Sequence, residues 1–136
     1  LNDLSNTYNG TEDKDWIYGM GGDDTLYGNA GDNYIYGGKG NDTLYGGVDI
    51  DVLYGDEDDD MLYGDLGDDS LYGREGNDTL DGGDGNNTLY GDIGDDYIYG
   101  GIVVDIIYGG HGNDTITSRL GADARTGEEG NVVVMT

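Results

Sequence analysis

The chain has 136 residues, of which 29 are Gly and none is Pro, Cys or Phe, and its formal net charge is -25 at pH 7. Repulsion among carboxylates and the backbone entropy of glycine normally leave such a chain disordered. Disulfides are excluded, and nucleic acid is excluded as a partner because 30 acidic residues outnumber five scattered basic ones. Cations are the expected partners. The basic residues are Lys14, Lys39, Arg74, Arg119 and Arg125.

The start of the chain lacks the features of a membrane or signal segment. No apolar run is long enough to span a bilayer, and no basic stretch followed by an apolar one opens the sequence. We therefore expect no membrane insertion and no removable leader. Residues 1–9 predict a degenerate N-terminal repeat, because Asn6, Thr7, Tyr8 and Asn9 precede Gly10 in the register of the later units. We expect the chain to begin inside a longer protein.

Residues 10–117 consist of twelve consecutive nine-residue units. Nine is not a helical period, and each Gly makes helix less favourable by about 1 kcal/mol relative to Ala. The sequence therefore predicts an all-β fold. The period is marked by one aliphatic residue in each unit: Ile17, Leu26, Ile35, Leu44, Leu53, Leu62, Leu71, Leu80, Leu89, Ile98, Ile107 and Ile116.

Each unit combines a polar turn with a short strand. In the unit 37–45, the turn 37–42 precedes a strand in which Leu44 points inward, while Thr43 and Tyr45 point to solvent. A strand buried on one face needs a second sheet to cover it. We therefore expect a parallel β-roll, a solenoid of two short-stranded sheets with two units, about 18 residues, in each of about six coils.

Two positions before each inward aliphatic residue stands a carboxylate or a carboxamide. In a solenoid these side chains form two columns, one along each edge, and stacked carboxylates repel unless a cation lies between them. Oxygen ligands in flexible number favour Ca²⁺ over Mg²⁺. The candidate metal ligands are Asp15, Asp24, Asn33, Asp42, Asp51, Asp60, Asp69, Asp78, Asn87, Asp96, Asp105 and Asp114.

The units resemble the RTX (repeats-in-toxin) nonapeptide GGxGxDxUx, a calcium-binding β-helix repeat. The resemblance covers roughly residues 10–117 and implies a right-handed parallel β-roll with each Ca²⁺ between one turn and the turn 18 residues later. The earlier turn would give the carbonyls of its second and fourth residues and its Asp, and the later turn those of its first and third residues and its Asp. One implied site comprises Gly38 O, Gly40 O and Asp42 with Gly55 O, Glu57 O and Asp60, and another comprises Asn29 O, Gly31 O and Asn33 with Gly46 O, Val48 O and Asp51.

The resemblance implies about ten Ca²⁺ ions, whose charge of about +20 would offset most of the net charge. One aliphatic side chain in nine buries too little apolar surface to order a glycine-rich chain, so we expect it to be unfolded without metal. The implied carbonyl ligands are Gly22, Gly31, Gly38, Gly40, Gly55, Glu57, Gly67, Gly73, Glu75, Gly76, Gly83, Gly85, Gly91, Gly94, Gly109 and His111.

Some units depart from the pattern. Asn33 and Asn87 replace an anionic ligand with a neutral one, so their sites should be weaker. Asp49, Asp58 and Val103 replace the fourth-position Gly of their turns, and a β-branched Val disfavours positive φ. Either the backbone of the turn 101–105 is distorted or the residue identities there are in error.

After Thr117 the register is expected to fail, because Arg125 would occupy the next inward position. Residues 118–136 are therefore predicted to form a C-terminal cap that ends in a strand within 131–136. The short apolar tail also resembles the uncleaved export signals of proteins sent out by type I secretion.

Tyr follows the inward residue in ten of the twelve units. On one sheet this predicts an aromatic outer face, which could be ordinary strand packing or a surface for self-association or polysaccharide. The other sheet carries a Thr array that could suggest ice binding, although Met61 and Tyr97 interrupt it. The aromatic face comprises Trp16, Tyr18, Tyr34, Tyr36, Tyr54, Tyr72, Tyr90 and Tyr108.

The sequence gives little support for catalysis. His111 is the single His, it occupies a variable turn position, and no thiol is present. The acidic run from Asp56 lacks the Gly and Glu that an EF-hand loop requires. We therefore expect no enzyme but a calcium-folded structural or interaction module of a secreted or cell-surface protein. The alternative is a non-catalytic accessory and secretion module of a larger exported enzyme or toxin.

Overall fold

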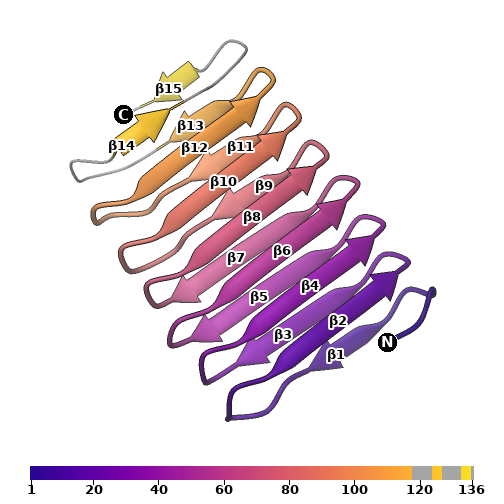
Figure 1. The fold of residues 1–136 in the computed structure, drawn as a ribbon. Coiled ribbons are helices and arrows are strands. Elements are labelled where there is room, and N and C mark those ends of the chain that lie inside the picture. The colour runs from indigo at the N-terminus through magenta and orange to yellow at the C-terminus, as the bar shows by residue number, and fades with distance from the viewer. Residues whose placement is uncertain (118–123, 127–132, 136) are drawn as a thin grey trace.

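The chain is a two-layered β-solenoid (Figure 1). The structure is a computed structural model and describes residues 1–117, 124–126 and 133–135. Within these residues there are strands and turns but no helix, so none of the described segments is a helix that could cross a membrane. The all-β prediction is confirmed.

The strands belong to two sheets, and successive strands along the chain alternate between them. The eight-stranded sheet contains β1 (Thr7–Asn9), β3 (Thr25–Asn29), β5 (Thr43–Val48), β7 (Met61–Leu66), β9 (Thr79–Asp81), β11 (Tyr97–Tyr99), β13 (Thr115–Thr117) and β15 (Val133–Met135). The seven-stranded sheet contains β2 (Trp16–Gly21), β4 (Tyr34–Lys39), β6 (Val52–Glu57), β8 (Ser70–Glu75), β10 (Thr88–Ile93), β12 (Ile106–His111) and β14 (Ala124–Thr126).

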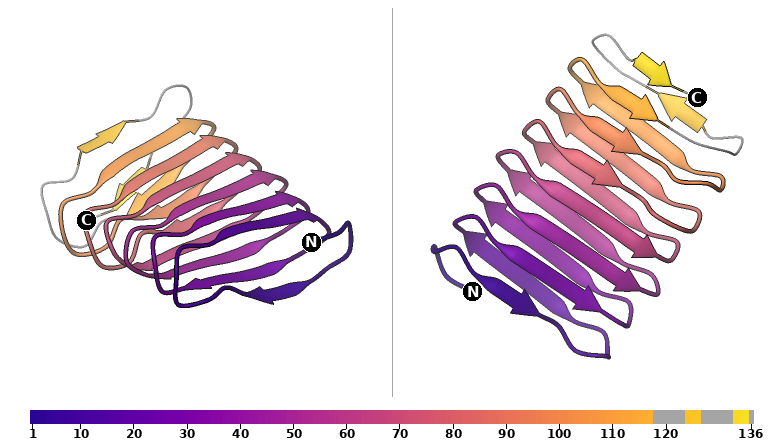
Figure 2. Two further views of the ribbon diagram at one scale, coloured as in Figure 1. Left: turned by 60° about the horizontal axis from the view of Figure 1, so that its bottom comes forward. Right: turned by 180° about the vertical axis from the view of Figure 1, so that it is seen from behind.

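Every pair of neighbouring strands is parallel and offset by 18 residues, as Leu26 opposite Leu44 and Ile35 opposite Leu53 illustrate. In Figure 1 the nearer strands, β2 to β12, run to the upper right while the chain climbs from the N-terminus at the bottom to the C-terminus at the top. The solenoid is therefore right-handed, and Figure 2 shows its flattened coils from two further sides. The predicted coil length and handedness are confirmed.

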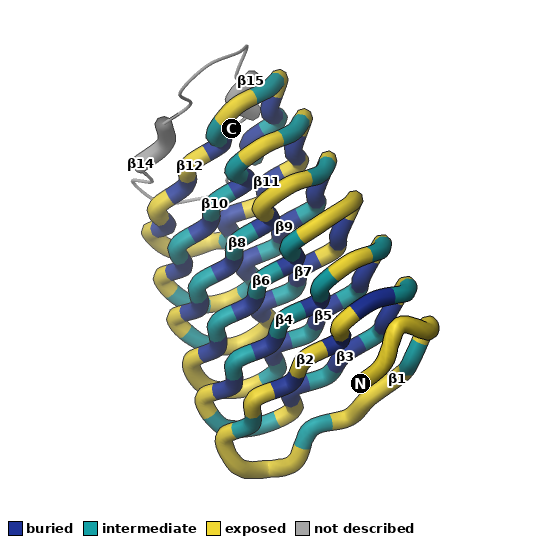
Figure 3. The backbone as a smooth tube through the Cα atoms, turned by 45° about the vertical axis from the view of Figure 1, so that its right-hand side comes forward, coloured by how far each residue is buried: buried dark blue, intermediate teal, exposed yellow. Residues whose placement is uncertain are grey.

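The core is a double row of aliphatic side chains between the sheets. All twelve predicted inward residues are buried, from Ile17 at the N-terminal end to Ile116 in β13. The pleat alternates these with outward residues, and the buried positions recur at the same place in each coil (Figure 3). The core is only one side chain deep in each layer, so the turns must supply much of the stability.

From the turn 19–24 onward, the described turns have residues in the left-handed region at their second and fourth positions, with one exception at Val103. Asp49 and Asp58 adopt this conformation in place of Gly, with φ of 82° and 79°. Val103 does not adopt it, although Gly101 in the same turn does, with a φ of 118°. The distorted-backbone interpretation of this turn therefore holds, because a β-branched side chain resists positive φ.

The 18-residue register continues past Thr117, so the expectation that it fails there is wrong for the backbone. In β14, Arg125 lies opposite Ile107, and in β15, Val134 lies opposite Ile116. Ladder hydrogen bonds use main-chain groups, so a strand can pair in register when its side chains no longer match the repeat. The rest of the predicted cap, 118–123, 127–132 and 136, lies outside the described residues. At the other end, β1 places Tyr8 opposite Leu26.

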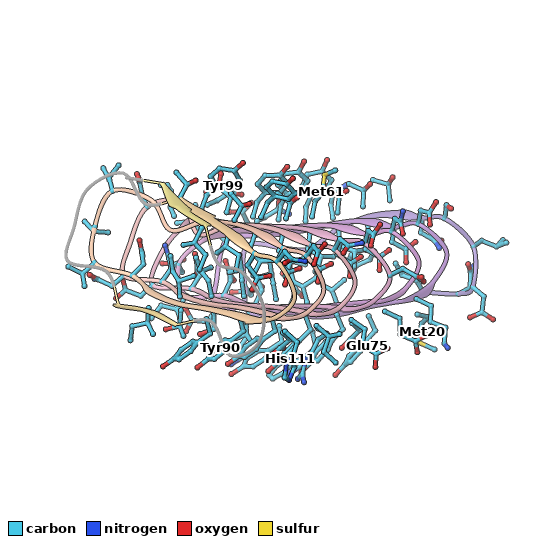
Figure 4. All side chains as sticks on the ribbon, turned by 90° about the horizontal axis from the view of Figure 1, so that it is seen from above. Met20, Met61, Glu75, Tyr90, Tyr99 and His111 are labelled. Carbon is cyan, nitrogen blue, oxygen red and sulfur yellow. The ribbon has the colours of Figure 1, made fainter. Side chains whose placement is uncertain are left out.

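The outer face of the seven-stranded sheet carries a continuous stack of tyrosine rings. Neighbouring rings from Tyr18 to Tyr108 lie 4.7 to 4.9 Å apart between centroids and within 12° of parallel. Trp16 stacks on Tyr34 beside this row, with the Lys14 ammonium over both rings. Figure 4 shows Tyr90 on this face and Tyr99 and Met61 on the opposite one. We call the row Tyr18, Tyr36, Tyr54, Tyr72, Tyr90 and Tyr108 the tyrosine ladder.

Candidate metal sites between the coils

The predicted metal ligands form one column along each edge of the solenoid. The Asp24 edge follows the strands of the seven-stranded sheet and contains Asp24, Asp42, Asp60, Asp78, Asp96 and Asp114. The Asn33 edge follows the strands of the eight-stranded sheet and contains Asp15, Asn33, Asp51, Asp69, Asn87 and Asp105. All of these side chains except that of Asp15 are buried, at 0 to 2% exposure. So many buried carboxylates require partners.

One oxygen of each buried side chain has a structural partner in the preceding coil. The main-chain N–H of Asp42 donates to Asp60 Oδ1 at 2.7 Å, and that of Asp51 donates to Asp69 Oδ1 at 2.8 Å. The same bond recurs along both edges with an offset of 18 residues, beginning with the N–H of Asn6 and Asp24 Oδ1 at 2.7 Å. Oδ1 therefore links each coil to the one before it.

The other oxygen, Oδ2, is left without a hydrogen bond. Within the part of the chain that the structure describes, this holds for eight buried carboxylates on both edges. A buried, unpaired carboxylate oxygen is too costly to persist, so each of these atoms requires a proton or a cation. The eight residues are Asp24, Asp42, Asp51, Asp60, Asp69, Asp78, Asp96 and Asp114.

The first-position glycines of the turns shape the space around Oδ2. A Cβ on Gly46 would lie 2.6 Å from Asp51 Oδ2 and 2.8 Å from the carbonyl oxygen of Gly64 in the next coil. Gly46 is not in the left-handed region, so it is Gly for lack of space and not for its φ. The cradle thus brings a bare carboxylate oxygen beside a carbonyl oxygen of the following coil, as a hard, oxygen-binding cation requires.

The predicted ligand atoms meet in this way in the first implied site. Asp42 Oδ2 and the carbonyl oxygen of Gly55 both lie against Gly37. The Glu57 side chain is turned outward and pairs with Lys39 at 2.9 Å, so only its carbonyl remains a candidate ligand. His111 and Glu75 also point outward from the sheet (Figure 4). In the second implied site, Asn33 places an amide nitrogen where the turns that end in Asp place Oδ2.

No three Asp, Glu or His side chains converge as a metal cluster anywhere in the described residues. The predicted donor set needs no such cluster, because it combines one carboxylate from each of two coils with main-chain carbonyls. Such a set is oxygen-only, flexible in number and doubly anionic, and it fits Ca²⁺. The residues present therefore fit the ion that the repeat implies.

Burial raises the pKa of the column carboxyls in the metal-free fold. Desolvation is the main cause, and it raises the pKa of Asp60 to about 8, of Asp42 and Asp69 to about 7, and of Asp51 to about 6. Hydrogen bonds from the preceding coil oppose the rise but do not cancel it. Without a cation, the folded turns therefore favour protonated carboxyls.

This shift predicts that acid promotes folding of the calcium-free chain. Asp has a pKa of about 3.9 when unfolded, so the metal-free fold binds more protons than the unfolded chain between about pH 4 and pH 8. Its stability must then rise as the pH falls through that window. Far-ultraviolet circular dichroism of decalcified protein should show growing β signal from about pH 8 to about pH 5. A signal that weakens over this range would contradict the prediction.

Two sets of functional residues were not predicted from the sequence. The first-position glycines Gly19, Gly37, Gly46 and Gly64 line the cradles, whereas the resemblance implied residues at this position only as carbonyl ligands of the later turn. The signal was present, since a Gly occupies this position in all twelve units. Asn6, whose N–H donates to Asp24 Oδ1, stands two residues before Tyr8 in the register of the later units, so the sequence carried a signal for it as well.

Comparison with known families agrees with this geometry. The model of the RTX calcium-binding nonapeptide repeat, written as four copies, matches residues 2–35, 9–44, 36–71, 45–80, 72–102 and 104–124. The comparison with curated proteins found no match. Because the repeat model covers most of the chain, the protein belongs to the RTX calcium-binding nonapeptide repeat family.

Proposed function

We propose that the protein is a calcium-folded structural module, in which Ca²⁺ ions lie between the turns of successive coils and hold the solenoid together. The observation that carries this proposal is the row of eight buried carboxylate oxygens without a hydrogen bond. All of them except that of Asp114 face a carbonyl oxygen of the next coil across a glycine cradle, as Asp51 Oδ2 faces Gly64 O. A cation there supplies charge that neutralises two carboxylates at once.

Each proposed site uses residues from two turns of the same edge. The site between the turns ending in Asp51 and Asp69 takes Oδ2 of Asp51 and the carbonyl of Gly64, which already lie together. It also takes the carbonyl of Asp49, which lies with Asp69 Oδ1 against Gly67. Six turns on each edge offer five gaps, so up to about ten ions would offset most of the charge of -25.

The proposal predicts stoichiometric calcium binding. Equilibrium dialysis of the full chain against radioactive calcium should give several bound ions per molecule. We expect at least seven, one for each unpaired Oδ2 that lies beside a carbonyl oxygen of the next coil. Magnesium should compete poorly, since the sites offer carbonyl-rich shells without strict octahedral geometry. Fewer than seven bound ions at saturating calcium would contradict the proposal.

The setting that suits such a module is outside the cell, where calcium is plentiful and extracellular sites of modest affinity remain filled. We place it in a secreted or cell-surface protein as a structural part without catalysis. The alternative is an accessory module that accompanies the catalytic part of an exported enzyme or toxin through type I secretion. Sequence adjoining this chain in its gene distinguishes the two.

The tyrosine ladder supports a further role in self-association. Its rings cover one another's faces, so the ladder presents ring edges and hydroxyls to solvent. Polysaccharide binding by stacking on sugars needs open ring faces, which only the ends of the ladder could offer. A second solenoid has the same ring spacing of about 4.8 Å and can match the row rung by rung. The favoured occupant is therefore a second copy of the chain.

Self-association through this face should depend on calcium and on the ladder. Sedimentation velocity with calcium should show dimers or larger species as protein concentration rises. Replacing Tyr54 and Tyr72 together by Ser should shift the association to at least tenfold higher concentration, because the centre of the interface loses two aromatic anchors. The same change at Tyr45 and Tyr63, which stack on the opposite sheet, is the matched control. A strictly monomeric wild type would refute the role.

A further inference from the structure

The two edges of the solenoid differ in their ligand columns. The Asp24 edge has Asp in all six turns, whereas the Asn33 edge has Asn33 and Asn87 among its six. Both asparagines are buried to the same degree as the aspartates, at 0% and 1% exposure. Their amide groups therefore occupy the interior of the turn, where the aspartates carry Oδ2.

The hydrogen bonds fix the orientation of each amide. The N–H of Asp15 donates to Asn33 at 2.9 Å and the N–H of Asp69 donates to Asn87 at 2.9 Å, so in each case the atom facing the preceding coil must be the oxygen, Oδ1. The NH₂ group is then left on the side of the following coil. It lies beside the first-position glycines Gly28 and Gly82, where the aspartates place Oδ2.

The NH₂ group of Asn33 takes up the carbonyl that an ion would need. Asn33 Nδ2 donates to Gly31 O at 2.7 Å and lies 3.4 Å from Ala30 O. Gly31 O is one of the proposed ligands in the gap between the turns of Asn33 and Asp51. A hydrogen-bond donor aimed at this oxygen repels a cation and satisfies the turn without one. On the other side, toward Asp15, Asn33 presents Oδ1, which is an oxygen that a cation can bind.

The same arrangement recurs at the second asparagine. Asn87 Nδ2 donates to Gly85 O at 3.3 Å within its own turn, on the side of the gap that leads to the turn of Asp105. That turn also contains Val103, which lacks the positive φ found at the fourth position of the other described turns from Gly22 onward. The gap between Asn87 and Asp105 thus departs from the cradle geometry on both of its sides.

We infer that Asn33 and Asn87 close their turns with a hydrogen bond in place of calcium, so that the gaps from Asn33 to Asp51 and from Asn87 to Asp105 bind no ion. The Asp24 edge then carries an unbroken row of five ions, and on the Asn33 edge the gaps 51/69 and 69/87 keep theirs. This inference rests on the proposed calcium sites and assigns which of them are filled.

The test compares calcium numbers among matched variants of the full chain, measured by equilibrium dialysis at saturating calcium. Asn33→Asp restores Oδ2 and should bind one more ion than the wild type. Asp51→Asn places an NH₂ group in the gap 51/69 and should bind one fewer. Asn41→Asp makes the same chemical change at an exposed position and should leave the number unchanged. The melting temperature with calcium should follow the same order.

The outcomes separate the inference from the function on which it rests. A wild type that binds calcium while Asn33→Asp adds no ion overturns the inference and leaves the calcium module standing. A wild-type count of ten, with every gap filled, also overturns it. A wild type that binds no calcium overturns both. Asn87→Asp combined with Val103→Gly should add one ion. No gain in that variant would count against the assignment that Asn87 is what keeps the gap from Asn87 to Asp105 empty.

Discussion

Removal of calcium is expected to unfold the whole chain. The core holds one inward aliphatic side chain per nine residues, which cannot by itself order a backbone containing 29 Gly. The metal-free fold also leaves eight buried carboxylate oxygens unpaired and a net charge of -25 uncompensated. Each ion that binds only the folded chain adds about 2.7 kcal/mol when its concentration is a hundred times its Kd. Several ions lost together exceed the stability of an ordinary domain.

Circular dichroism at neutral pH measures this directly. The β signal present in excess calcium should collapse to that of a disordered chain after chelation, and it should return when calcium is restored. Magnesium at the same concentration is the control and should restore little of the signal, because it requires a stricter octahedron. A β spectrum that persists at neutral pH in excess chelator would show that the roll folds without metal.

The second large effect is expected from Asp60→Ala in the middle of the Asp24 edge. Asp60 Oδ1 accepts the main-chain N–H of Asp42 at 2.7 Å, and its Oδ2 is one of the unpaired oxygens. The change leaves a buried N–H without an acceptor, which costs about 1–3 kcal/mol. It also removes a ligand from the gaps 42/60 and 60/78. We expect the loss of two ions and a marked fall in the melting temperature with calcium.

Two matched variants calibrate this effect. Asp60→Asn keeps Oδ1 and replaces only Oδ2, so it should lose the single ion between Asp60 and Asp78. Asp84→Ala removes one carboxylate from an exposed position of the same repeat array. It should leave the number of bound ions unchanged and alter the stability by no more than about 0.5 kcal/mol. Calcium counting and thermal melts in parallel provide the readout. If Asp60→Ala behaved like Asp84→Ala, the column aspartates would not be ligands.

The period of the sequence predicted most of the fold. Because one aliphatic residue recurs every nine positions, the pleat and the coil length followed, and all twelve inward residues are buried. Local exceptions were harder to predict. Met20 and Arg74 adopt positive φ, at 86° and 87°, although neither residue favours it, because pairing with the neighbouring strands fixes the turn. Pairing of main-chain groups also extends the register to Arg125, although an Arg side chain does not match the aliphatic residue of the repeat at this position.

The candidate sites were predictable in position but not in detail. The sequence identified the column residues, since no unit lacks an Asp or Asn there. It could not show that the two oxygens of one side chain have different roles, because that depends on the N–H of a turn 18 residues earlier. For the same reason the sequence predicted only that Asn33 is a weaker ligand. In the structure, Asn33 presents its oxygen to the gap toward Asp15 and its NH₂ group to the gap toward Asp51.

The hydrogen-bonded column of aspartates along the Asp24 edge makes neighbouring sites dependent on one another. Asp60 borders two gaps, accepts from Asp42 and donates its own N–H to Asp78, so it can hold one geometry only when the coils on both sides are in place. Filling one gap therefore preorganises the carboxylate for the next. Such a chain of nearest neighbours fills or empties over a narrow range of calcium concentration, and the solenoid should respond to calcium as a cooperative switch.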